Sequence, residues 1–394
     1  MKKIVISGFY GSDNAGDEAI LASMLATIKE VVSDADIIVL SGNVEQTTKR
    51  HNIKALSNST MKIPKTLSTL KNADLFILGG GGLLQDDSSI LNLIFWLIRV
   101  SLAKLLNKCV MCYAIGVGPI DTKLGKFLTK LIINKVNLIT VRDSESKKLL
   151  KNLGVNRPPI YVTADPAFVL SSATPERVSE IFARENIIKK HHCPLIGISV
   201  ERLYGFKRVL PVKYSVKYNI WSPGGKSKFE KFKAEMAQVA DSLVTKLNAE
   251  IVFVPMYHGR DDKVSADIVQ IMKNKNHAKV VTGMYTPQEL KGIIGQMDMF
   301  VGLRLHSLIF AASMCIPMVG LAASSPKIRS FLKLIGQEMY VCDVNDFNSN
   351  DLLIKIEEVW VNREQIRKKL KSKVNVLQKR ALSNAKLVSE LLKD

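Results

Sequence analysis

Two short stretches near residue 300 carry side chains suited to binding an anion and moving a proton. Arg304 and His306 follow the apolar run 299–301, and Lys327 follows a second apolar run at 318–321. Each run is expected to form a strand and each basic segment to open a helix, so the three side chains should meet at one edge of a parallel sheet. Cations and helix N-termini bind anions, and an imidazole can transfer protons near neutral pH. The sequence therefore predicts an enzyme that acts on a small anion.

A second group of candidates follows the first apolar run, which ends at Ser7. Asp13 and Asn14 are expected on a loop, where they would hold sugar hydroxyls or accept a proton from one. Asp17 and Glu18 would do the same or would simply complement a helix dipole. The glycines of this segment do not follow the G-x-G-x-x-G spacing, and its carboxylates would repel a pyrophosphate, which excludes a dinucleotide fingerprint. Asp13 is the preferred base, with the choice among the three acids left open.

Three further loops contribute candidate substrate-binding residues. Gly80 and Gly81 belong to a run of four glycines whose backbone amides would face a substrate, with a tight packing turn as the alternative. Arg142 follows another predicted strand and would reach the site or form a surface pair with Asp143 or Glu145. His258 follows a strand of the second half and would bind substrate or stay solvated. Ser325 precedes Lys327 in the motif Ser324-Ser325-Pro326-Lys327 and completes the predicted binding set.

The elements that must position these residues alternate between strands and helices, which is typical of a doubly wound α/β sheet. We expect residues 1–175 to form an N-terminal Rossmann-like domain that binds the acceptor substrate. Residues 190–360 should form a C-terminal Rossmann-like domain that binds the small anion. Residues 361–394 form a charged helix that could pack back on the first domain. Two such domains facing a cleft describe a GT-B-like architecture. The predicted strands are 4–7, 36–40, 75–78, 110–115, 138–141 and 161–163, then 195–200, 251–255, 279–282, 299–301 and 318–321.

Two segments stand apart from this alternation. A basic insert at 204–228 separates a predicted strand from its helix, and long loops of this kind are often functional. Residues 90–106 are apolar nearly all round but carry Arg99, and they are too short and too interrupted to span a bilayer comfortably. They would form either a buried crossover helix or an interfacial helix that inserts Phe95 and Trp96 into lipid. In the second case anionic head groups would meet the basic residues Arg99, Lys104, Lys123, Lys126 and Lys130.

Composition limits the class of protein. The chain has 394 residues, 47% of them hydrophobic, which is ample for two domains. A formal net charge of +20 indicates anionic partners, whereas 7% aromatic residues give no sign of a stacking surface for nucleic acid. Five cysteines at irregular spacing form neither a disulfide framework nor a zinc site, so no metal is expected. The N-terminus enters a strand directly, so we expect a cytoplasmic protein, peripheral on the inner face of the membrane.

Taken together, the motifs resemble those of the polysaccharide pyruvyltransferase family. The resemblance is strongest to the CsaB branch of this family, which modifies bacterial secondary cell-wall polymers used in surface-layer anchoring. The similarity covers nearly the whole chain in order. The motifs are G-x-x-N-x-G-D-E from Gly11 to Glu18, GGGG-L-x-Q-D from Gly79 to Asp86, R-D-x-x-S from Arg142 to Ser146, A-D-P-A-F from Ala164 to Phe168, R-x-H-S from Arg304 to Ser307, and S-P-K from Ser325 to Lys327.

The resemblance implies transfer of pyruvate from phosphoenolpyruvate, a co-substrate, onto two hydroxyls of one sugar, forming a 4,6-ketal and releasing phosphate. The implied acceptor is a β-linked N-acetylmannosamine on a lipid-diphosphate-linked oligosaccharide at the inner membrane surface. His306 would protonate the methylene carbon and Asp13 would take the proton of the sugar hydroxyl. No step requires a cofactor. The alternative is a GT-B glycosyltransferase that uses a nucleotide sugar.

Overall fold

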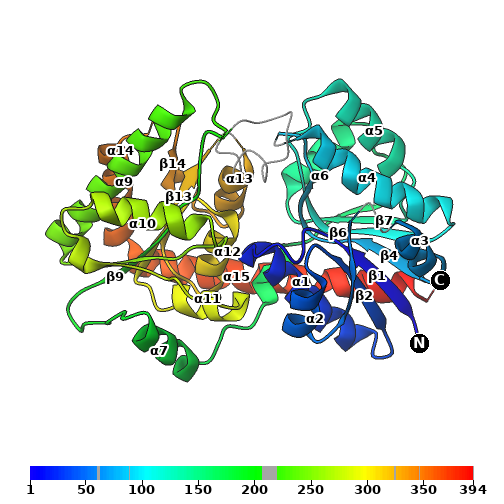
Figure 1. The fold of residues 1–394 in the computed structure, drawn as a ribbon, viewed down its shortest axis with the longest axis horizontal. Helices are drawn as coiled ribbons and strands as arrows, with labels where there is room; N and C mark the ends of the chain where they lie inside the picture. The colour runs from blue at the N-terminus through cyan, green and yellow to red at the C-terminus, as the bar shows by residue number, and fades with distance from the viewer. Residues whose placement is uncertain (60–62, 88, 206–219, 324, 346, 394) are drawn as a thin grey trace. The chain divides into compact units, whose positions relative to one another are not determined.

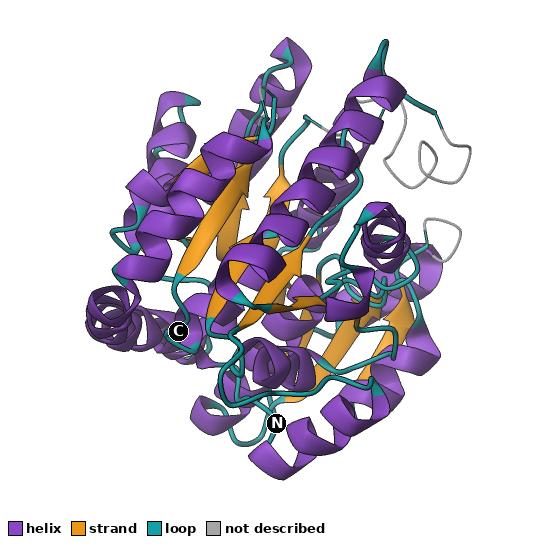
Figure 2. Ribbon diagram, turned by 90° about the vertical axis from the view of Figure 1, so that its left-hand side faces the viewer, coloured by secondary structure: helices purple, strands orange, loops and turns teal. Residues whose placement is uncertain are grey.

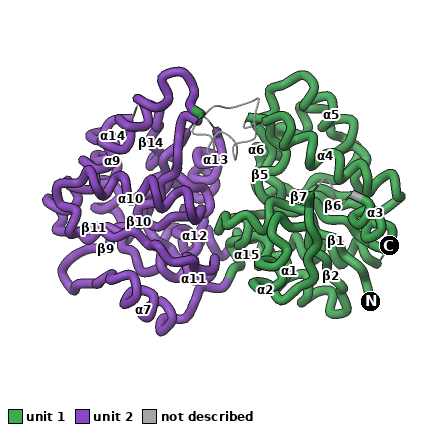
Figure 3. The backbone as a smooth tube through the Cα atoms, viewed as in Figure 1, with its two compact units in different colours: residues 1–170, 206–220, 377–394 green, residues 171–205, 221–376 purple. Residues whose placement is uncertain are grey.

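The computed structural model describes residues 1–394 except 60–62, 88, 206–219, 324, 346 and 394. The chain divides into two compact units (Figure 3). Unit 1 comprises 1–170, 206–220 and 377–394, and unit 2 comprises 171–205 and 221–376. Most of the predicted basic insert, and Ser324 of the S-P-K motif, lie outside the described residues.

Unit 1 is built on a parallel sheet in the order β3-β2-β1-β4-β6-β7-β8, with β5 paired to β6 (Figure 1). Its strands are β1 (Lys3–Ser7), β2 (Asp36–Ser41), β3 (Lys54–Ser57), β4 (Leu75–Leu78), β5 (Gly81–Leu84), β6 (Cys109–Val117), β7 (Leu138–Val141) and β8 (Ile160–Val162). The helices are α1 (Ala15–Val31), α2 (Val44–His51), α3 (Ile63–Lys71), α4 (Ile90–Leu105), α5 (Lys123–Ile133) and α6 (Ser144–Asn152), and a short 3-10 helix covers Pro166–Val169.

Unit 2 repeats the same plan with a sheet in the order β11-β10-β9-β12-β13-β14. Its strands are β9 (Leu195–Ser199), β10 (Glu250–Phe253), β11 (Ala278–Val280), β12 (Met299–Gly302), β13 (Met318–Ala322) and β14 (Val341–Asp343). Its helices are α7 (Pro175–Arg184), α9 (Gly225–Leu247), α10 (Asp261–Ile271), α11 (Pro287–Ile294), α12 (Leu305–Ser313), α13 (Lys327–Leu334) and α14 (Ser349–Val361), and α15 (Arg363–Leu391) continues from unit 2 into unit 1.

The central strands form where the sequence is continuously apolar. Every residue of β4, β9, β12 and β13 is buried, as expected for parallel strands that are covered on both faces. Helices lie on both sides of the strands in each unit (Figure 2). The end of α15 closes one face of unit 1, because Ala385, Val388 and Leu392 join the apolar cluster around β1 and α1. The predicted fold class, two Rossmann-like doubly wound domains, is therefore confirmed.

Three strands were not predicted. β3 and β14 are edge strands of four and three residues, and both include polar residues that interrupt the apolar run. β5 corrects the expectation of a four-glycine loop, because Gly81 and Gly82 already belong to this strand and Gly81 is aligned with Ile115 of β6. The amides of the last two glycines are therefore part of the sheet edge rather than of an open loop.

Of the two alternatives for residues 90–106, the one in which Phe95 and Trp96 insert into lipid does not agree with the structure. Trp96 is only 6% exposed and belongs to the core of unit 1, and Phe95 packs against that core. Arg99 is buried too: its guanidinium lies 3.6 Å from the Phe95 ring centroid and donates to the carbonyl oxygens of Phe95 and Asn58. The segment forms the crossover helix α4, and the side that carries Trp96 is packed in the core. Within the described residues, no helix combines the length and apolar composition needed to cross a membrane.

Candidate functional site

Each sheet has a topological switch point, where the chain connections leave in opposite directions on either side. In unit 1 it lies between β1 and β4, and in unit 2 between β9 and β12. Ligands of open α/β sheets bind beyond the carboxyl ends of the strands at such points. In unit 1 these ends lead into the loops 8–14 and 79–80, and in unit 2 into 200–202 and 303–304. The candidate residues on these loops are described unit by unit.

Tyr10 fills the space beneath the first loop of unit 1 and leaves no room for a side chain at the glycines beside it. The side chain is buried and its hydroxyl donates to the sulfur of Met24 at 3.5 Å. A Cβ at Gly79 would lie 2.0 Å from the Tyr10 hydroxyl oxygen, so no larger residue fits there without movement of the ring. Burial, followed by the charges of Asp17 and Glu18, raises the pKa of Tyr10 well above its usual value. The phenol stays protonated, and its part at this edge of the sheet is to support the two loops.

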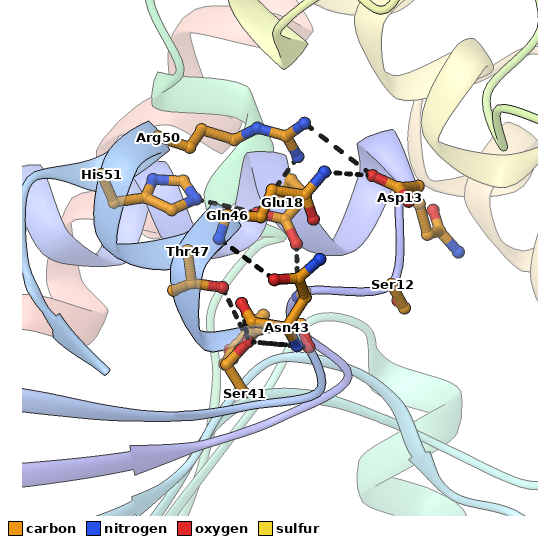
Figure 4. A network of polar contacts seen from close by, with 12 residues as sticks. Ser12, Asp13, Glu18, Ser41, Asn43, Gln46, Thr47, Arg50 and His51 are labelled. Carbon is orange, nitrogen blue, oxygen red and sulfur yellow. Dashed lines mark hydrogen bonds and ion pairs between the residues drawn. The ribbon is translucent and has the colours of Figure 1, made fainter. Parts of the chain in front are cut away.

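Asp13 is the half-exposed acid of this edge (Figure 4). It has a φ of 58°, a left-handed conformation that aspartate tolerates better than most residues. Its carboxylate accepts a hydrogen bond from Gln46 and lies 3.9 Å from Nη2 of Arg50, both on α2. The neighbouring Asn14 caps α1, where its side-chain oxygen accepts from the amide of Gly16 at 3.0 Å. Asp13 is thus held in place while part of its carboxylate faces solvent.

Glu18, the third acid considered as a base, is buried and fully engaged (Figure 4). One carboxylate oxygen accepts from the amide of Gly11 at 2.7 Å, and the other lies 2.8 Å from Nε2 of His51 and 3.6 Å from Nη1 of Arg50. Burial raises the pKa of Glu18, but the His51 and Gly11 hydrogen bonds and the Arg50 charge outweigh it and hold this pKa below its usual value. Glu18 therefore ties α2 to the loop and is a poor proton acceptor.

This lowered pKa makes Glu18 a source of pH-dependent stability. A carboxyl group whose pKa is lower in the folded state contributes stability above its unfolded value, about 4.3, and loses it as pH falls through the folded value. We expect Glu18→Gln to lose stability less steeply than the wild type on acidification from about pH 5 to pH 3. Thermal melting across this range measures the difference, with the exposed Glu45→Gln as control. Equal pH slopes for wild type and Glu18→Gln would contradict the assignment.

Asp17, Gly80 and Gly81 lie together beneath the loop. Asp17 is 9% exposed, and one of its carboxylate oxygens would be 3.0 Å from a Cβ built on Gly81. Gly80 is buried between Ile20 of α1 and the backbone of β6. The structure therefore brings Asp17 and the glycine strand into contact, and it gives both glycines a packing role.

Arg142 is a buried member of the same edge of the sheet. It is 6% exposed, and its Nη1 lies 3.1 Å from Oδ2 of Asp165 and its Nε 3.8 Å from Oδ2 of Asp143. A Cβ on Gly116 would approach this guanidinium to 2.7 Å, so the glycine in β6 makes room for it. Asp165 belongs to the A-D-P-A-F motif, which explains why this motif accompanies the strand-end arginine. The charge of Arg142 is compensated within unit 1.

In unit 2, Arg304 lies at the switch point between two carboxylates. Its Nε and Nη2 donate to Asp261 at 2.9 and 2.7 Å, and its Nη1 lies 2.7 Å from Oε2 of Glu201. Asp261 is fully buried, whereas the Arg304 side chain is 24% exposed. Burial alone would lower the pKa of Arg304, but the charges of Asp261 and Glu201 raise it. This arrangement differs from the predicted arginine that offers its charge to an anion, because each nitrogen of Arg304 already faces a carboxylate.

His306 and Lys327 begin neighbouring helices. β12 and β13 are adjacent parallel strands, and α12 and α13, which follow them, contact each other. His306 is in the first turn of α12, and Lys327 is the first residue of α13. Ser325 lies just before α13 and is partly buried. These residues therefore follow adjacent strands at the carboxyl-end edge of the sheet, where two helices begin.

His258 is exposed on the loop after β10. Its neighbours on that loop make the following contacts: the Arg260 guanidinium lies 4.2 Å from the ring centroid of Tyr257, and the Tyr257 amide donates to Asp261 at 3.0 Å. The guanidinium carbon of Arg304 lies 5.8 Å from the ring centroid of Tyr257. The sequence analysis assigned no role to Asp261 or Glu201. Glu201 lies two residues after β9, which was the available signal, whereas Asp261 is the first residue of α10 and lies eight residues after β10.

Comparison with solved structures identifies the fold class. The chain is similar to a UDP-GlcNAc 2-epimerase from Neisseria meningitidis solved with UDP-GlcNAc, with a TM-score of 0.63, 12% identity and 100% of both chains covered. It is also similar to a glycosyltransferase from Rickettsia africae ESF-5, with a TM-score of 0.60, 14% identity and coverage of 100% and 99%. These similarities show a GT-B fold, and at such identities they show nothing of the reaction.

The sequence comparison is more specific. The model of the polysaccharide pyruvyl transferase family matches residues 14–325, which include every candidate residue described above except Asp13 and Lys327. The chain belongs to the polysaccharide pyruvyl transferase family and is a transferase of that class. A curated relative, the amylovoran biosynthesis protein AmsJ of Erwinia amylovora, is 22% identical over 438 residues and covers 99% of each sequence.

Proposed function

We propose that the protein transfers pyruvate from phosphoenolpyruvate to two hydroxyls of one sugar, closing a 4,6-ketal and releasing phosphate. The proposed acceptor is β-linked N-acetylmannosamine of a lipid-diphosphate-linked oligosaccharide in the biosynthesis of a secondary cell-wall polymer. Membership of the pyruvyl transferase family supports the reaction type. The observation that carries the assignment is the pair of neighbouring helix N-termini that hold His306 and Lys327 at the switch-point edge of unit 2.

Phosphoenolpyruvate carries a phosphate and a carboxylate, and both kinds of group bind at helix N-termini and beside lysine. In our proposal the first turns of α12 and α13, with Lys327 and Ser325, bind these groups. Arg304 is assigned a supporting part, because Asp261 and Glu201 together outweigh its charge. It fixes the turn between β12 and α12 and thereby the position of His306.

The chemical steps then follow in order. His306 donates a proton to the methylene carbon of phosphoenolpyruvate, which leaves positive charge on the carbon that bears the phosphate. A sugar hydroxyl bonds to this carbon while Asp13 takes its proton. Phosphate leaves with its electron pair, the second hydroxyl bonds to the same carbon, and its proton is released. The product is a cyclic ketal whose carbon carries the methyl and carboxylate groups of pyruvate. We propose no cofactor.

Lys327→Ala should weaken phosphoenolpyruvate binding. A charge-assisted hydrogen bond contributes about 1.5 to 3 kcal/mol, so the dissociation constant is expected to rise by roughly one to two orders of magnitude. Isothermal titration calorimetry measures this effect. Lys333→Ala is the matched control, since this exposed lysine lies in the last turn of the same helix. If Lys327→Ala binds as tightly as Lys333→Ala, the lysine is not part of the donor site.

A further inference from the structure

Six large apolar side chains are exposed on two helices of unit 1 that lie side by side (Figure 1). Each is about half exposed or more, and Leu105 reaches 77%. Soluble proteins rarely expose apolar side chains in such a group unless the surface has a partner. The residues, which we call the α4–α5 surface, are Leu91, Ile98 and Leu105 on α4 and Leu124, Phe127 and Leu131 on α5.

On each helix these residues share one face. Leu91, Ile98 and Leu105 are seven residues apart, which places them on one side of α4 at 3.6 residues per turn. The opposite side of α4 carries Leu93 and Trp96, which are buried in the core of unit 1. On α5 the spacing 124, 127, 131 likewise defines one face. Each helix therefore has two apolar sides, one packed inside and one exposed.

The two helices pack directly against each other. A Cβ on Gly125 of α5 would lie 3.1 Å from Cδ2 of Leu93 on α4, and Phe95 and Leu128 both pack against the same core. The exposed residues therefore lie on two neighbouring helices of unit 1, and we treat them together as one surface.

Lysines border this area. Lys123, Lys126 and Lys130 of α5 are exposed, and at 100° per residue they lie on the flank of the helix away from Leu128 and Ile132, which pack on the core. Lys135 follows just beyond the helix and is also exposed. Neither α4 nor α5 contains an acidic residue. An apolar face with a basic edge matches the boundary between acyl chains and anionic head groups.

We infer that the α4–α5 surface docks unit 1 onto an anionic lipid bilayer, with the apolar side chains in the acyl boundary and the lysines at the head groups. The inference deepens the proposed function and rests on it, since an acceptor carried on a lipid diphosphate would be met at such a surface. A second copy of the chain is a poorer occupant. A symmetric interface repeats the same patch on both sides, so the lysine rows would lie close to each other and repel.

Vesicle co-sedimentation of the full chain tests this inference. The wild type should bind vesicles of phosphatidylglycerol and phosphatidylcholine, bind pure phosphatidylcholine weakly, and lose binding as salt rises. Ile98→Ser/Phe127→Ser and Lys123→Glu/Lys126→Glu/Lys130→Glu should each reduce partitioning by roughly tenfold or more. Because these side chains are exposed, circular dichroism and melting should match the wild type.

Matched control variants come from unit 2. Met339→Ser/Ile354→Ser removes two exposed apolar side chains, and Lys368→Glu/Lys369→Glu/Lys373→Glu reverses three exposed lysines. Both should bind as the wild type does. The inference is overturned if the wild type does not bind anionic vesicles, if the controls lose binding equally, or if light scattering shows a dimer that Ile98→Ser/Phe127→Ser dissociates.

Activity on a water-soluble acceptor separates this inference from the proposed function. Ile98→Ser/Phe127→Ser should form the ketal on such an acceptor at the wild-type rate while failing to bind vesicles. A wild type that binds anionic vesicles but forms no ketal would refute the proposed function and leave the docking surface standing.

Discussion

His306→Ala should lower turnover by roughly two to four orders of magnitude, the usual contribution of one positioned general acid. The residue lies in the first turn of α12, directly after the buried strand β12, and its removal leaves the core of unit 2 intact. Phosphoenolpyruvate binding should persist, because the helix N-termini and Lys327 are unchanged. The expected signature is therefore a fall in kcat with a small change in the affinity for phosphoenolpyruvate.

A steady-state and calorimetric comparison measures both quantities. His192→Ala is the control, since His192 is an exposed histidine of the same unit before β9. If His306→Ala keeps near-normal kcat across the pH range, His306 does not supply the proton. If it loses binding instead of turnover, the residue is a ligand of the donor rather than its acid.

Arg304→Ala is expected to reduce the stability of unit 2 by on the order of 3 kcal/mol, at the lower end of the cost of breaking a buried ion pair. The reason is Asp261, which is fully buried and receives two hydrogen bonds from Arg304. Without the guanidinium this carboxylate remains in the interior, where the Tyr257 amide still donates to it at 3.0 Å. Urea denaturation of the variant measures the loss.

A double-mutant cycle separates charge pairing from side-chain volume. Asp261→Asn in the Arg304→Ala background removes the buried charge and should recover part of the lost stability. Glu201→Gln alone should cost little, since this side chain is 28% exposed and solvent can take over its contacts. An Arg304→Ala variant as stable as the wild type would show that the ion pair does not hold the turn between β12 and α12.

The central strands could be predicted because parallel strands covered on both faces consist of continuous apolar residues, as in β4 and β12. The strands that the sequence analysis missed lack a continuous apolar run: β3 contains Lys54 and Ser57, β5 begins with two glycines, and β14 ends at Asp343. Short length alone is not the reason, because β4 also has four residues and was predicted from its apolar run. The doubly wound class did not depend on these strands.

Candidate site residues could be predicted where they follow the end of a strand closely in the sequence, as Arg304 and His306 do. They could not be predicted where a partner comes from another strand end. Glu201 is more than a hundred residues from Arg304, and Asp261 is 43 residues away, so only the strand order β10-β9-β12 brings the three together. The alternative that placed Trp96 in lipid has a similar origin, because the apolar pattern of α4 does not reveal which of its two apolar sides faces the core.

The most direct test of the proposed function is incubation of the protein with phosphoenolpyruvate and a synthetic lipid-diphosphate disaccharide that ends in β-linked N-acetylmannosamine, followed by mass spectrometry. The predicted result is an acceptor heavier by one pyruvic acid less one water, with one phosphate released per ketal. An unmodified acceptor, together with transfer of a sugar when a nucleotide sugar replaces phosphoenolpyruvate, would contradict the proposed function.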